Sequence, residues 1–159
     1  MVRRVKFLNQ FWLYFDFIVG IGIVHTVKEL EVSTRLTLAT EKDYLLGDNS
    51  DIIATDSQKN TVYVLAKKFG IKSPEDFSIL LCNHFLSKYS HVMKVVIEIE
   101  EVLWNRISYG EGNTHMYHNH AFIHTPICGR TTKVMWKRNG EINLMIKLFN
   151  FSSFSLNQN

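Results

Sequence analysis

Residues 47–61, GDNSDIIATDSQKNT, decide how this chain folds and where its chemistry would lie. Gly47 and the Asp and Asn residues after it predict a turn, and residues 52–54 form a short apolar step. Thr55 and Asp56 are residue types that cap helix N-termini, so we expect a helix to begin at one of them. The stretch therefore connects a turn directly to a helix start.

Two amphipathic helices are predicted after this start. In the first, apolar residues recur at i, i+3, i+4 and i+7, and Gly70 fits the position that ends a helix. The second begins with Ser73 as N-cap, Pro74 at the first helical position and Asp76 at the third. The predicted buried faces are Val62, Leu65, Ala66 and Phe69 in the first helix, and Phe77, Leu80, Leu81, His84 and Phe85 in the second.

Alternating apolar and polar residues predict strands on either side of this helical pair. Residues 30–38 and 94–103 have the period of two that is typical of half-buried strands. We expect residues 104–119 to form a loop and residues 120–125 a further strand, and an N-terminal strand remains possible. The pattern indicates an α+β domain with two helices packed on one face of an antiparallel sheet.

Composition agrees with one globular domain. The chain has 159 residues, 46% hydrophobic and 21% charged, and a domain of this size buries about two-thirds of its surface on folding. A net charge of +3 with scattered lysines argues against a nucleic-acid-binding protein. The two cysteines, Cys82 and Cys128, cannot form a disulfide framework, so a reducing compartment is the simpler interpretation.

The sequence around the first helix resembles the urate oxidase (uricase) family. The resemblance extends from 36–61, LTLATEKDYLLGDNSDIIATDSQKNT, through LAKKFGIKS at 65–73 and HFL at 84–86 to HAFIHTP at 120–126. It covers roughly residues 27–126 and implies a tunnelling fold (T-fold), of which urate oxidases carry two copies in tandem. We therefore expect a single, incomplete copy, with an atypical apolar segment at 1–26 and a divergent tail at 127–159.

The same resemblance implies a reaction and part of a site. Urate oxidases convert urate, O2 and water to 5-hydroxyisourate and H2O2 without a metal or organic cofactor, and they work as homotetramers, typically in peroxisomes. The resemblance assigns Thr55 to catalysis and substrate binding, and Asp56 to substrate binding. The family's proton relay also needs a lysine on the first strand and a histidine of the second domain. Neither has a match here: Lys6 is a poor substitute and Lys28 lies too far along the chain.

Other functions stay open beside urate oxidation. A non-catalytic remnant could bind purine or pair with full-length subunits. The histidines at 115, 118, 120 and 124 could bind zinc or copper, although strand histidines are the simpler interpretation. A pterin-converting enzyme of this fold, which would need a zinc-binding Cys/His set, is a separate alternative. Residues 7–24 form an apolar run after Arg3 and Arg4 that resembles a signal anchor, but Asp16 interrupts it. The chain also ends without a peroxisomal Ser-Lys-Leu tripeptide.

Overall fold

The computed structural model describes residues 8–20, 25–110, 116–124 and 128–150. Seven strands and three helices follow one another along these residues. Their bounds are β1 Leu8–Gly20, β2 His25–Leu38, α1 Lys42–Leu46, α2 Thr55–Phe69, α3 Pro74–Lys88, β3 Val92–Val102, β4 Trp104–Tyr109, β5 Met116–His124, β6 Cys128–Lys137 and β7 Ile142–Asn150.

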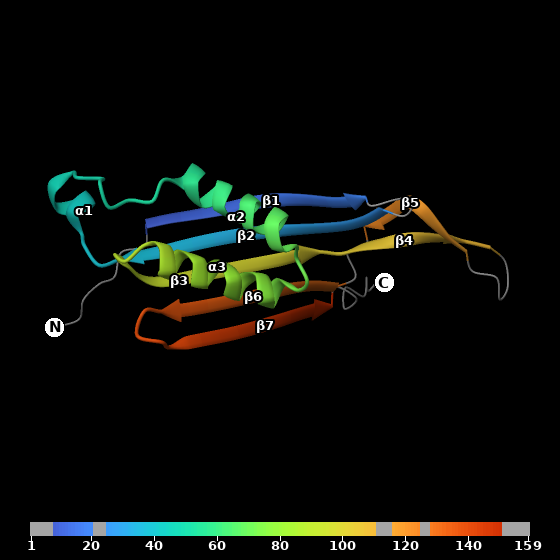
Figure 1. The fold of residues 1–159 in the computed structure, drawn as a ribbon. Helices are drawn as coiled ribbons and strands as arrows, with labels where there is room; N and C mark the ends of the chain where they lie inside the picture. The colour runs from blue at the N-terminus through green and yellow to red at the C-terminus, as the bar shows by residue number, and fades with distance from the viewer. Residues whose placement is uncertain (1–7, 21–24, 111–115, 125–127, 151–159) are drawn as a thin grey trace, which may run out of the picture.

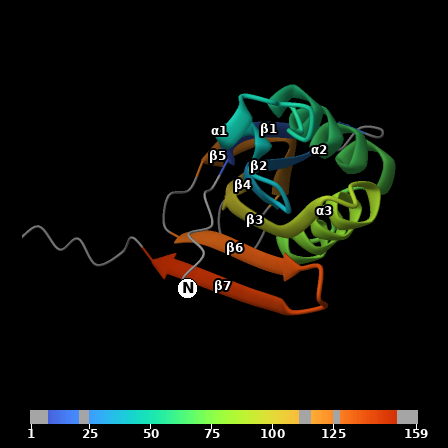
Figure 2. The ribbon, with the colours of Figure 1, turned by 90° about the vertical axis from the view of Figure 1, so that its left-hand side faces the viewer.

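Five of the strands form one antiparallel sheet in the order β1-β2-β3-β6-β7, which leaves β1 and β7 at its edges. Helices α2 and α3 lie side by side on one face of this sheet (Figures 1 and 2). Strands β4 and β5 form a separate hairpin, which lies at the end of the molecule opposite α1 and the loop that leads into α2 (Figure 1). The predicted α+β arrangement is therefore confirmed.

The core lies between the helices and the central strands. Val32 of β2 pairs with Ile99 of β3, and both side chains are fully buried. From the helices, Val62 and Phe85 meet this layer and are equally inaccessible. Side chains at alternate positions of β2 and β3 thus pack against the two helices, as the period of two predicts.

The helix bounds follow the sequence signals, with two corrections. Ser73 caps α3 as predicted, since its Oγ accepts a hydrogen bond from the Asp76 backbone N–H at 3.1 Å. At α2, however, Ala54 occupies the N-cap position and Thr55 is the first helical residue, so Thr55 and Asp56 do not act as caps. Phe69 is 53% exposed instead of buried, because it is the last residue of α2 and the chain turns away at Gly70, whose φ is +69°.

Charged side chains fasten α3 to strand β6. Glu75 in the first turn of α3 accepts hydrogen bonds from Arg130 at 2.6 Å and from Thr132 at 2.8 Å. At the other end of α3, the Arg138 guanidinium donates to the carbonyl oxygens of Leu86 and Tyr89 at 2.7 and 2.6 Å. The helix is therefore held at one end by residues of β6 and at the other by Arg138, which directly follows β6.

The apolar N-terminal segment contributes a strand to the main sheet. β1 pairs antiparallel with β2 from Leu8↔Leu36 to Gly20↔His25. None of the helices in the described parts of the chain is long and apolar enough to cross a membrane. The sheet runs across the domain boundaries expected near residues 26 and 126, and those boundaries stay a prediction.

The region predicted as a loop, residues 104–119, is largely strand, so that prediction is wrong. β4 and β5 pair from Trp104↔His124 to Tyr109↔Met116, and most of their side chains are exposed. Arg106 lies over the Phe122 ring at 4.7 Å, and Trp104 Nε1 donates to Glu29 at 2.6 Å. A hairpin with no buried face lacks the apolar alternation that marks a strand in a sequence.

Candidate functional site

The loop that enters α2 is fixed by polar contacts to the end of β2. Asp51 accepts a hydrogen bond from Thr40 Oγ1 at 2.6 Å and forms an ion pair with Lys42 at 3.2 Å. These two partners lower the pKa of the Asp51 carboxyl. Asp48 accepts a hydrogen bond from the Ser50 backbone N–H at 2.9 Å, the local pattern of an Asx turn. The loop thus delivers the chain to α2 along a defined path.

The opening of α2 carries the two predicted site residues at its surface. Thr55 is half-buried and Asp56 is exposed, and no side chain caps the first turn. The backbone N–H groups at the first three helical positions have no partner within a helix, and the helix dipole places about half a positive charge there. Such an opening can receive the oxygen atoms of a flat anion, with the Thr55 hydroxyl beside it.

Gln58 anchors this opening to the sheet, and the sequence analysis did not single it out. Its side chain is only 1% exposed. Its Oε1 accepts a hydrogen bond from the buried Thr34 Oγ1 at 2.7 Å, and its Nε2 donates to the Ile53 carbonyl at 2.9 Å. One amide therefore connects β2, the residue before the N-cap and the first turn of α2.

A signal for this anchor exists in the sequence. Gln58 stands four residues before Val62, on the buried face of α2, and Thr34 stands within the apolar stripe of β2. Buried polar side chains are nearly always hydrogen-bonded, so two polar residues on opposing core faces point to one another.

The lysines weighed for the proton relay do not approach the α2 opening in the described residues. Lys28 Nζ donates to the backbone carbonyls of Ile71 and Lys72 at 2.8 and 3.0 Å, in the connection that follows the far end of α2. Lys6 lies outside the residues that the structure describes. The lysines Lys59, Lys67 and Lys68 of α2 are exposed, as a solvated helix face requires.

The clustered histidines belong to the β4–β5 hairpin. His118, His120 and His124 are exposed on β5, at the end of the molecule away from the loop before α2 (Figure 1); His115 lies outside the described residues. Over the described ranges, no three His, Cys, Asp or Glu side chains are grouped so that they could hold a metal ion. Cys82 is fully buried, and burial raises the pKa of its thiol to about 12.

Comparisons with known proteins agree on one family. The family model described as Uricase matches residues 21–135. A uricase of Drosophila subobscura is 50% identical over 121 residues, which are 66% of this chain and 36% of that protein. A uricase of the rabbit, Oryctolagus cuniculus, is 48% identical over 119 residues, 75% of this chain and 38% of that protein.

Solved structures show the same fold. The uricase from Arthrobacter globiformis superposes with a TM-score of 0.74 at 26% identity, over 89% of this chain and 47% of that chain. A uricase from Bacillus fastidious gives a TM-score of 0.73 at 21% identity, over 92% of this chain and 52% of that chain. The T-fold is therefore confirmed, and the chain spans about half the length of the solved uricases that it matches.

Proposed function

The chain belongs to the uricase family, and from this premise we propose that it forms the N-terminal part of a urate oxidase. The reaction is the oxidation of urate by O2 and water to 5-hydroxyisourate and H2O2. Urate supplies both electrons to O2, and water supplies the hydroxyl oxygen, so no metal or organic cofactor takes part. The chain would contribute one wall of the urate site, and a second T-fold copy would contribute the other.

The observation that carries this proposal is the uncapped, solvent-accessible opening of α2. A helix N-terminus stabilises an anion by about 0.3–2 kcal/mol, which lowers the cost of removing a proton from urate. The Thr55 hydroxyl can donate to a purine oxygen or pass a proton to a bound water. The exposed Asp56 carboxylate would repel an anion, so we assign its contact to the backbone N–H.

Gln58 gives this wall the rigidity that the reaction needs. Catalysis depends on holding the reacting groups within a few tenths of an ångström. The two hydrogen bonds of Gln58 fix the first turn of α2 against β2, so the Thr55 hydroxyl does not depend on the loop alone for its position.

An alternative function follows from the length of the match. The chain covers about half of the solved uricases, and Lys28 is engaged with the backbone at 71–72. A remnant with one wall of the site would bind purine without turnover, or would pair with full-length subunits.

Two measurements on the purified chain separate these functions. In the first, urate absorbance and H2O2 are followed in air; turnover without added subunits supports the enzyme and refutes the remnant. In the second, backbone amide shifts are followed during urate titration under argon. We expect shifts at residues 55–57, and binding about 2- to 12-fold weaker in Thr55→Val, since one hydrogen bond contributes about 0.5–1.5 kcal/mol. Lys59→Ala, on the exposed side of α2, is the control. Shifts elsewhere with none at 55–57 would contradict the assignment.

A further inference from the structure

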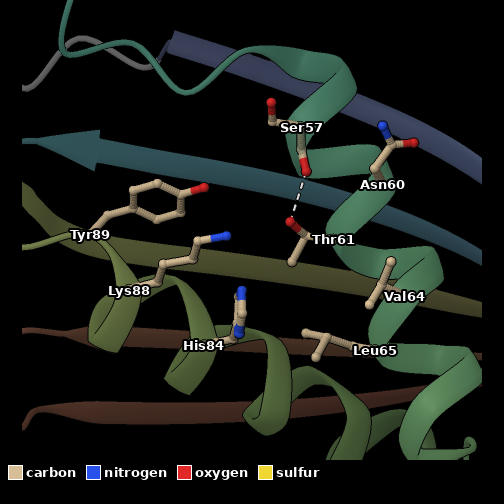
Figure 3. A pocket seen from close by; sticks show the side chains of 8 residues that line it. All are labelled: Ser57, Asn60, Thr61, Val64, Leu65, His84, Lys88 and Tyr89. Atoms are coloured by element: carbon tan, nitrogen blue, oxygen red, sulfur yellow. Dashed lines mark hydrogen bonds between the residues drawn. The ribbon is translucent and has the colours of Figure 1, made fainter.

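A groove of about 340 Å³ lies between α2 and α3, on the outer side of the helical layer (Figure 3). This volume is within the range of small-molecule sites, about 300–1,000 Å³. We call it the α2–α3 groove. Its lining residues are Ser57, Asn60, Thr61, Val64, Leu65, His84, Lys88 and Tyr89.

The groove shares Ser57 with the α2 opening, but its other lining residues lie beyond that opening. At 3.6 residues per turn, Gln58 and Val62 point into the core, whereas Thr61 and Leu65 project from α2 toward α3 (Figure 3). Thr55 is not among the lining residues. The groove is therefore not explained by the site proposed for urate.

The charge of the groove is positive. Lys88 is its one permanently charged lining residue, and within the described residues Lys88 forms no ion pair with a carboxylate. Burial, followed by the proximity of Lys88, lowers the pKa of the His84 ring. Figure 3 shows both side chains pointing from α3 toward α2.

Two backbone features favour an anion further. Helix C-terminal carbonyl oxygens would repel an anion near Lys88, but Arg138 engages those of Leu86 and Tyr89. Ser57 lies in the first turn of α2, at the positive end of the helix dipole. The Thr61 hydroxyl donates to the Ser57 carbonyl at 2.7 Å, so Thr61 can only accept from a ligand. The donors that point from α3 toward α2 are Lys88, His84 and the Tyr89 hydroxyl (Figure 3).

We propose that the α2–α3 groove binds a small organic monocarboxylate. Its carboxylate lies against the Lys88 ammonium, and its apolar body lies on Val64 and Leu65. One lysine balances one negative charge, whereas a phosphate dianion would remain half-compensated and would leave the apolar wall uncovered. The inference does not depend on the proposed urate reaction.

The test is a titration of the full chain with sodium benzoate, at constant ionic strength, followed by backbone amide shifts. We expect saturable shifts at Ser57, Thr61, Lys88 and Tyr89. Benzyl alcohol, which has the ring without the charge, and inorganic phosphate, which has charge without the ring, should each bind at least about fivefold more weakly. Equal binding of benzyl alcohol would overturn the role of the charge, and equal binding of phosphate would overturn the role of the apolar wall.

Two variants locate the site. Lys88→Met should weaken benzoate binding by about 5- to 10-fold, the loss of one exposed charge-assisted hydrogen bond. Lys59→Met removes the same charge from α2 outside the lining and should leave binding unchanged. Val64→Asp places a negative charge on a side chain that is 60% exposed, so the fold tolerates it and binding should be lost. Equal effects of Lys88→Met and Lys59→Met, or undiminished binding by Val64→Asp, would refute the proposal.

Discussion

The hydrogen-bonded pair of Gln58 and Thr34 allows a quantitative prediction about the start of α2. Gln58→Leu keeps most of the side-chain volume but leaves the Thr34 hydroxyl and the Ile53 carbonyl without their partner. Thr34 and Gln58 are almost completely buried, so water cannot replace the amide. Each buried polar group that loses its partner costs about 1–3 kcal/mol, and we expect the free energy of unfolding to fall by about 2–4 kcal/mol.

A second substitution isolates the direct bond. Thr34→Val removes the hydroxyl that Gln58→Leu leaves unpaired. Replacing both hydrogen-bond partners by apolar groups of similar shape is close to neutral for stability. The Gln58→Leu/Thr34→Val double variant should therefore be about 1–2 kcal/mol more stable than Gln58→Leu alone. Lys59→Leu, at an exposed position of the same helix, should change stability by less than about 0.5 kcal/mol.

The measurement is urea unfolding followed by circular dichroism and tryptophan fluorescence. The wild type, Gln58→Leu, Thr34→Val, the double variant and Lys59→Leu are compared at one pH. Strict additivity of the two single substitutions would refute the reasoning, since it would mean that the two side chains do not interact. Amide shifts at residues 55–57 in Gln58→Leu would report the loosened helix opening independently of stability.

Three further predictions concern other parts of the fold. Ser73→Ala removes the N-cap of α3 and should lower the free energy of unfolding by about 1 kcal/mol; an unchanged urea midpoint would contradict the cap. Burial alone would raise the pKa of the Glu75 carboxyl, but hydrogen bonds from Thr132 and Arg130 lower it overall. A depressed folded-state pKa stabilises the fold above the unfolded value of about 4.3 and is lost as pH falls through the folded value. As the pH is lowered below about 4.5, the urea concentration at the unfolding midpoint should therefore decrease, and it should decrease less steeply in Glu75→Gln. Parallel pH profiles of the two proteins would exclude a contribution of Glu75 to acid stability. Burial raises the pKa of Cys82 to about 12, so in a Cys128→Ser background the folded chain should resist Ellman's reagent at pH 8 and react only on unfolding; a fast native reaction would show that the thiol is accessible.

The helical layer and central strands could be predicted because each carries a local signal. Ser73 and Pro74 mark the start of α3 by their chemistry, and Gly70 ends α2 because its φ of +69° suits glycine. In β2 and β3 one side of each strand is buried against the helices, so the period of two is visible. The position of Thr55 at the first turn follows from the same signals to within one residue.

The remainder depends on contacts between distant residues. The β4–β5 hairpin is exposed on both faces, so its strands carry no apolar alternation in the sequence. Its pairing depends on contacts between the two strands, such as that of Arg106 with the Phe122 ring. The segment 7–24 resembles a membrane anchor in sequence because no sequence period shows that its residues 8–20 pair with β2. The sequence places Thr34 and Gln58 on buried faces, but the bond between them spans 24 positions, and their pairing depends on how α2 packs on the sheet.

The two open sides of the main sheet have a geometric consequence for assembly. Each strand is rotated by about 20–25° against its neighbour, so a copy joined at β1 or β7 continues the rotation instead of lying flat. The assembly closes into a ring only if the strands also tilt and their register staggers by the amount that closure requires; otherwise it is an open filament. The tilt and register at which a second copy would join an edge strand therefore decide between a closed particle and a filament.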